Sequence, residues 1–93
     1  MGRKIRFKKK IMEALDLPLE TVLDVPRLIV LGNERVLVEN HKGIYEYYPN
    51  FVRLQTGIGI LKVTGEELTL KELSAQRLYV DGKISSFEYE NKV

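Results

Sequence analysis

The side chains that could perform chemistry are few in this sequence of 93 residues. His41 is the single histidine, and it lies in a glycine-ended turn with few acids around it. The serines Ser74, Ser85 and Ser86 lack the Gly-x-Ser-x-Gly context that marks the nucleophile of many hydrolases. Because a nucleophile needs a base that a third group orients, this inventory argues against a catalytic triad. We expect no enzyme activity.

Metal and phosphate sites also lack their usual residues. The chain has no cysteine, which removes disulfides, thiolate zinc sites and cysteine nucleophiles. Glu66, Glu67 and Glu72 cluster in the sequence, but adjacent residues on a strand point to opposite faces, so we interpret them as solvated surface. The glycines stand at turns and open no phosphate-binding loop. We therefore expect no cofactor and no metal.

One polar cluster remains, the tetrapeptide of Asn40, His41, Lys42 and Gly43. It is our candidate recognition turn. In the alternative interpretation, Asn40 and Gly43 only supply the positive φ angles of a turn, while His41 and Lys42 occupy its exposed tip. The sequence alone favours this structural alternative.

The positive charge of the chain is concentrated at its start. The net charge is only +2, yet residues 1–10 contain no acid and six basic residues, which are Arg3, Lys4, Arg6, Lys8, Lys9 and Lys10. The remainder holds thirteen acidic side chains against nine basic ones, so it is mildly acidic. The six basic residues are our candidate contacts for a partner or for lipid.

The basic segment has the pattern of an amphipathic helix, which we place at residues 1–16. Phe7, Ile11 and Leu15 recur at intervals of four and share one helical face. Such a leader can bind anionic lipid or a protein surface, or it can neutralise nucleic-acid phosphates. It can also pack its apolar side on the edge of the domain while its charges stay in water.

A connection and a single domain follow the leader. Pro18 ends the helix, because proline disfavours helical angles in the residue before it, and Pro26 flanks the other end of the predicted connection at 17–26. The all-β domain is predicted at 27–90. The N-terminus lacks the apolar run of a signal peptide, and no window reaches the roughly 18 apolar residues of a membrane span. We expect a cytoplasmic protein, either free or peripheral at a membrane.

Short apolar segments separated by turn residues predict the strands of this domain. They are RLIVL, RVLVE, IYEYY, FVRLQ, IGILKV, ELTLKEL, QRLYV and KISSFEY. Turns are expected at Thr64-Gly65 and, as a hairpin, at Asp81-Gly82, with a bulge at Ser85-Ser86. The predicted fold class is mainly β: the short N-terminal amphipathic helix followed by a small antiparallel meander, rolled into a barrel or a two-layer sandwich. A β-solenoid-like stack is the alternative.

Two of these strands carry large apolar side chains on both faces. The segment from Leu28 to Leu31 must be covered on both sides by the helix, by a second layer of sheet or by another subunit, which indicates a homo-oligomer. Tyr45, Tyr47 and Tyr48 fall in one strand. Large rings at such spacing more often complete the edge of a core than form a ligand site, so we interpret them as part of the core.

Four strings carry a resemblance to a known family: Gly32-Asn33, Val38 to Ile44, Gly59 to Leu70, and Leu78 to Ile84. Their order and spacing resemble the YabP/YqfC family of sporulation proteins over essentially the whole chain. The turn at 40–43, the basic leader and the chain length are more similar to the YqfC branch than to YabP.

This resemblance implies a protein of endospore-forming bacteria that is made in the mother cell during sporulation. It implies a membrane protein of the YqfD type as partner, and it brings no catalytic residues. We therefore expect a non-enzymatic interaction module, a cytoplasmic accessory of a membrane protein in the mother cell. The alternative is a nucleic-acid-binding regulator that uses the basic leader. The acidic domain and the shortage of aromatic residues beside the basic ones count against this alternative.

Overall fold

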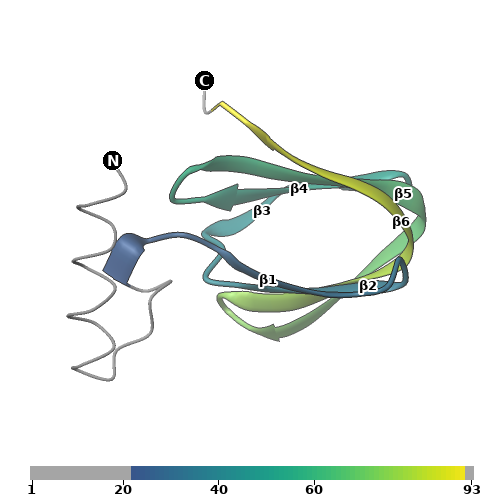
Figure 1. Cartoon of the computed structure of the whole chain (residues 1–93), viewed down its shortest axis with the longest axis horizontal. Coiled ribbons are helices and arrows are strands. Elements are labelled where there is room, and N and C mark those ends of the chain that lie inside the picture. Colours follow the sequence, from purple (N-terminus) through teal and green to yellow (C-terminus); the bar gives the residue numbers. More distant parts are fainter. Residues whose placement is uncertain (1–21, 92–93) are drawn as a thin grey trace.

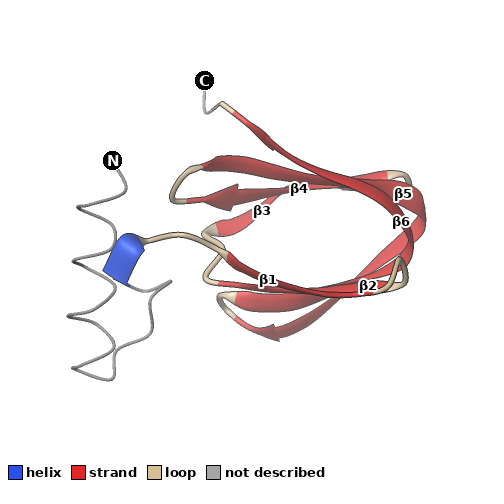
Figure 2. Cartoon of the chain, viewed as in Figure 1, coloured by secondary structure: helices blue, strands red, loops and turns tan. Residues whose placement is uncertain are grey.

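The computed structural model describes residues 22–91, which form one antiparallel sheet of six strands (Figures 1 and 2). The predicted leader helix lies outside the described residues. Along the sheet the strand order is β1-β2-β6-β5-β4-β3. The strands are β1 (Arg27–Leu31), β2 (Arg35–Glu39), β3 (Gly43–Tyr48), β4 (Phe51–Thr56), β5 (Gly59–Ser74) and β6 (Arg77–Glu90).

Two long strands organise the sheet. β5 and β6 pair with each other along nearly their whole length, from Ile60 opposite Glu90 to Ser74 opposite Arg77. The first half of β5 also pairs with β4, and the first half of β6 also pairs with β2. The hairpin of β1 and β2 therefore flanks one half of the long pair, and the hairpin of β3 and β4 flanks the other half. In Figure 1 the sheet curls into an open roll.

The long pair bends where its register shifts. Thr64 lies opposite Ser86 and Gly65 lies opposite Ile84, so Ser85 is an extra residue on β6. The predicted bulge at Ser85-Ser86 is thus confirmed, and bulges of this kind bend a strand and increase its twist. A second shift, between Glu66 and Thr69, lies directly beyond it on β5.

The predicted turns at Thr64-Gly65 and Asp81-Gly82 are wrong, because β5 and β6 run straight through both dipeptides. The hairpin prediction rested on the residue types of the Asp81-Gly82 dipeptide, and Gly82 does have a positive φ, of 135°. Here it serves the bend: a Cβ at Gly82 would lie 2.8 Å from the carbonyl oxygen of Glu67. Glycine permits that close approach of two backbones.

The core lies on the inner face of the roll and draws on both halves of the sheet. Strict alternation in β2 and β4 places every second side chain inside. Leu28, Leu70 and Phe87 are partly buried against this core. Its buried members are Val36, Val38, Val52, Leu54, Leu61, Val63, Leu68, Leu78, Val80 and Ile84.

The architecture corrects part of the fold prediction. The domain is mainly β and antiparallel, as expected, but β1 and β3 are the two ends of an open sheet, so the barrel is not closed. A single sheet also replaces the two layers of a sandwich, since its two halves curl over one core. The β-solenoid-like alternative is wrong, because such coils stack in parallel and every strand pair here is antiparallel.

Two glycines with nearly the same backbone angle test the role of the bend. Gly82 and Gly43 have φ values of 135° and 134°, but a Cβ at Gly43 would meet nothing within 4 Å. Gly43→Ala should therefore cost only the backbone strain, about 1–3 kcal/mol. Gly82→Ala should cost that strain plus a steric term of about 1–3 kcal/mol. Urea unfolding of both variants measures the difference, and equal losses would contradict the close approach at the bend.

Candidate functional site

The free strand edges are the most distinctive surface of the domain. Within residues 22–91, four strand segments pair on one side only: β1, β3, the second half of β5 and the second half of β6. A free edge presents unpaired N–H and C=O groups that can accept another strand. The two edges formed by whole strands, β1 and β3, also carry exposed apolar side chains.

The edge at β3 is aromatic. Tyr45, Tyr47 and Tyr48 are 45–52% exposed, so their predicted place in the core is wrong. The reason is that β3 is the last strand of the sheet, so no described strand lies beyond it to cover these rings. Ile44 lies opposite Leu54 and Glu46 opposite Arg53, so Tyr45 is an extra residue at a bulge. Three rings therefore line an accessible edge.

Two of these rings are held in place. The hydroxyl of Tyr47 donates a hydrogen bond of 2.7 Å to the carbonyl oxygen of Leu68, which ties β3 to the bend of β5. The ring of Tyr48 packs on Phe51 with centroids 4.9 Å apart, a distance at which aromatic pairs attract each other. An edge whose aromatic side chains are already fixed loses little entropy when a partner binds.

The edge at β1 is aliphatic. Leu28 packs against the core, but Ile29, Val30 and Leu31 are 37–58% exposed. The sequence predicted that this strand needs cover on both faces. The described residues supply it on the inner face at Leu28 and leave the rest of the strand open.

Ion pairs fix the charged groups on the outer face of the sheet. Arg35 donates two hydrogen bonds to the carboxylate of Asp81, from Nε at 2.6 Å and from Nη2 at 2.9 Å. The hydrogen bond to Asp81 raises the pKa of Arg35 above its ordinary value. Arg53 lies between Glu46 at 2.6 Å and Glu90 at 3.0 Å. The pairs Arg35–Asp81 and Arg53–Glu46 join neighbouring strands, and the pair Arg53–Glu90 spans β5 between β4 and β6. These charged groups of the outer face are therefore already paired within the domain.

The candidate recognition turn is part of the structure rather than a free loop. The prediction that His41 occupies an exposed tip is wrong, because only 3% of the residue is accessible. The Nδ1 atom of His41 accepts a hydrogen bond of 3.0 Å from the N–H of Gly43. Its Nε2 atom is buried and has no hydrogen-bond partner among residues 22–91. Burial lowers the pKa of His41 below its ordinary value, and the charge of Glu72 opposes this only in part.

The other members of the turn tie down neighbouring segments. Asn40 adopts a positive φ of 63°, as predicted. Its Nδ2 donates a hydrogen bond of 2.9 Å to the carbonyl oxygen of Val25. Lys42 forms an ion pair of 2.7 Å with Asp24. The turn therefore anchors the chain just before β1, and no signal in the sequence indicated this role.

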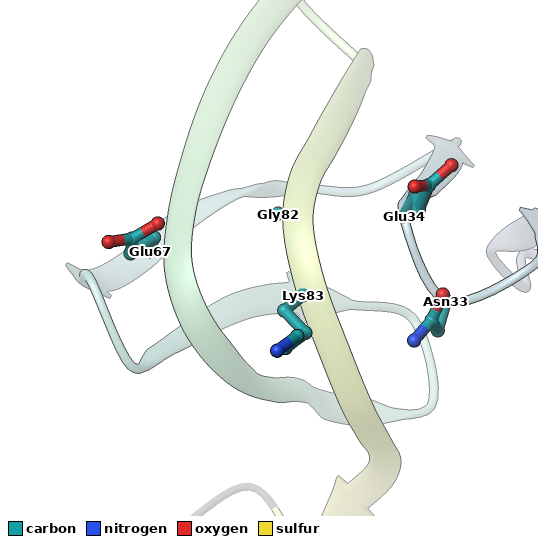
Figure 3. Close-up of a pocket in the computed structure, with 5 residues that line it drawn as sticks. All are labelled: Asn33, Glu34, Glu67, Gly82 and Lys83. Carbon is teal, nitrogen blue, oxygen red and sulfur yellow. The ribbon is translucent and has the colours of Figure 1, made fainter.

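A hollow of about 390 Å³ lies on the outside of the bend, lined by Asn33, Glu34, Glu67, Gly82 and Lys83. Figure 3 shows Glu34 and Glu67 on opposite sides of β6, with their carboxylates turned away from each other. No group of three metal-binding side chains is found in the described part of the chain. The hollow does not bring these charges together for chemistry.

Of the two sequence-predicted sites, the structure describes only the turn. The turn at 40–43 lies at one end of the roll, and the six basic residues of the leader lie outside the described residues. Across 22–91 no helix has the length and apolar character needed to cross a bilayer. Of the surfaces that the described residues bring together, the apolar edges are the ones suited to binding.

Two comparisons with known proteins find similarity to this chain. The model of the YabP family matches residues 24–93. A Bacillus subtilis (strain 168) protein described as "Uncharacterized protein YqfC" is 29% identical over 87 residues, which span 94% of this chain and 94% of that protein. No solved structure matches the chain.

The burial of His41 predicts a pH dependence of stability. Because its pKa is lower in the folded state than in the unfolded chain, the unfolded state binds more protons and stability rises with pH. The contribution is fully present above about pH 6.5, the unfolded value, and is lost as the pH falls toward the folded value. Since this is the single histidine, His41→Gln should flatten unfolding midpoints between about pH 5 and 7. If the unfolding midpoint of His41→Gln depends on pH as steeply as that of the wild type, the burial of His41 is contradicted.

Proposed function

This chain belongs to the YabP family, and we propose that it is a non-enzymatic assembly module of sporulation that binds other proteins through its free strand edges. In this proposal it works in the cytoplasm of the mother cell as an accessory of a membrane protein of the YqfD type. This setting is the one that the resemblance to the sporulation family implies, and the similarity to the Bacillus subtilis protein YqfC supports that resemblance.

The observation that carries the proposal is the pair of exposed apolar edges. Ile29, Val30 and Leu31 on β1 and the three tyrosines on β3 remain accessible in the described domain. Small soluble domains usually protect such edges with charges, prolines or bulges. The β1 edge, which pairs with β2 in unbroken register, suits strand addition, in which main-chain hydrogen bonds supply affinity and side-chain pockets supply specificity. The β3 edge is interrupted by a bulge, and it offers its exposed rings as side-chain contacts.

We assign the membrane-protein partner to the β3 edge. Tyrosine is enriched at interface hot spots because it offers a large, rigid contact area and a polar tip. The hydroxyl of Tyr47 is already bonded to Leu68, while Tyr45 and Tyr48 have their rings about half exposed. These two rings are the contacts that we expect the partner to cover.

The basic leader has a second role in this proposal. The six basic residues from Arg3 to Lys10 would hold the chain at the acidic membrane surface or against acids of the partner. The two interactions are complementary, because attraction to the membrane raises the local concentration at which the β3 edge meets its partner.

Replacing two tyrosines tests the β3 edge. The double variant Tyr45→Ser and Tyr48→Ser should lose at least tenfold in affinity for the detergent-solubilised YqfD-type protein, about 1.4 kcal/mol. The loss of affinity is measured by the amount of the membrane protein that the immobilised chain retains. Ile58→Ser is the matched control, since Ile58 is equally exposed but lies between β4 and β5. Equal recovery by both variants would contradict the assignment.

Neutralising the leader tests the membrane contact. Glutamine at all six basic positions should remove most binding to vesicles that contain phosphatidylserine, because each basic residue contributes on the order of 1 kcal/mol near an anionic surface. Vesicle co-sedimentation of the two proteins measures the loss, and vesicles of neutral lipid are the control. Undiminished binding would contradict an electrostatic role of the leader. Tight, steeply salt-dependent binding to duplex DNA would instead favour a nucleic-acid regulator.

A further inference from the structure

The four free edges differ in how well they are protected against strand addition. β3 has the bulge at Tyr45 and a charge at Glu46. The second half of β5 has two register shifts and the charges of Lys71 and Glu72. The second half of β6 begins at the Ser85 bulge and contains Glu88 and Glu90. Bulges and charges are the devices that keep edges from pairing.

β1 has only one of these devices, the charge of Arg27 at its first residue. Its five residues pair with β2 in unbroken register, from Arg27 opposite Glu39 to Leu31 opposite Arg35. After Arg27 it contains no charge, and it contains no proline. A regular, apolar edge of this kind is expected to be covered by another strand.

We propose that a second copy of this chain pairs antiparallel with β1 across a two-fold axis, which joins the two sheets into one. This inference rests on the proposed function and names the partner of one edge. A two-fold pairing closes on itself and stops at the dimer, whereas pairing of β1 with β3 of the next copy would continue into open fibres.

The pleat fixes the register of the pair. Side chains alternate between faces with a period of two, and a two-fold axis normal to the sheet keeps each residue on its own face. Paired residues must therefore have numbers of the same parity. The register that pairs all five residues places Ile29 opposite Ile29, Leu28 opposite Val30, and Arg27 opposite Leu31 of the second copy.

Packing and charge agree with this register. Leu28 and Val30 share the inner face with the buried Val38 and Val36, their partners on β2, so the pair extends the core of each copy into that of the other. The two Arg27 side chains lie at opposite ends of the interface. Each comes next to the turn of the second copy that holds the exposed Glu34, which places opposite charges side by side.

The size of the edge sets the strength of the dimer. A five-residue strand pair buries less than the roughly 1,600 Å² of a standard stable interface. We therefore expect a dissociation constant on the order of micromolar, so that the dimer forms where the chain is locally concentrated.

Charge substitutions at the two-fold axis test the proposal. Ile29→Lys and Ile29→Glu should each weaken dimerisation at least tenfold, because like charges would face each other across the axis. An equimolar mixture of the two variants should restore dimerisation, since lysine then faces glutamate. Sedimentation velocity of the full chain over a micromolar concentration series measures all three samples, and circular dichroism verifies that each variant is folded.

Two substitutions of Leu31 should change the affinity of the dimer in opposite directions. Leu31 is the most exposed of the large hydrophobic residues of β1, so its replacement disturbs the fold less than that of Ile29 or Val30. Leu31→Glu should tighten the dimer several-fold because it faces Arg27 of the second copy, and Leu31→Lys should weaken it several-fold.

Three results would overturn the proposal: a wild-type chain that stays monomeric over the series, charged variants that dimerise like wild type, or a mixture that stays monomeric. A monomeric wild type would leave β1 to a different protein. These measurements use the purified chain alone and test only the dimer. The tyrosine variants test binding of the membrane-protein partner, so either proposal can be contradicted without the other.

Discussion

The pairing between β5 and β6 is the constraint on which the rest of the domain depends. These two strands are paired from Ile60 opposite Glu90 to Ser74 opposite Arg77, and each of β2 and β4 is attached to one of them. The long pair could not stay flat and still bury both of its ends. The register shifts beside Gly65 and Gly82 bend it, and the two halves then close over one core.

This bend explains why the domain has open edges. Each hairpin attaches its inner strand, β2 or β4, to the long pair, and leaves its outer strand, β1 or β3, at an end of the sheet. An isolated hairpin is marginal in water, so both depend on the buried residues that the curled sheet brings together. The scaffold that stabilises the domain is thus the same one that presents two different edges, one aliphatic and one aromatic.

Much of this fold could be predicted from local patterns, and the failures have physical causes. The alternation of apolar and polar residues in β2 and β4 is a local pattern, and it agrees with the burial of Val36, Val38, Val52 and Leu54. Asp-Gly and Thr-Gly were misinterpreted as turns because Gly82 and Gly65 instead allow a close approach of backbones: a Cβ at either would meet a carbonyl oxygen of the paired strand. The tyrosines were misplaced because the sequence does not show that β3 is the last strand of the sheet. The burial of His41 depends on segments distant in sequence, such as Gln76, whose carbonyl accepts the His41 N–H.

The candidate site was only partly visible in the sequence. The apolar segment at Leu28 to Leu31 was recognised as needing cover, but the sequence did not indicate which face remains open or that β1 is the least protected edge. Amide hydrogen exchange across a protein concentration series tests the use of that edge most directly. The account predicts that exchange within β1 slows as the chain is concentrated, while the already paired centre of β5 and β6 exchanges at a constant rate. Exchange in β1 that stays fast at every concentration would contradict it.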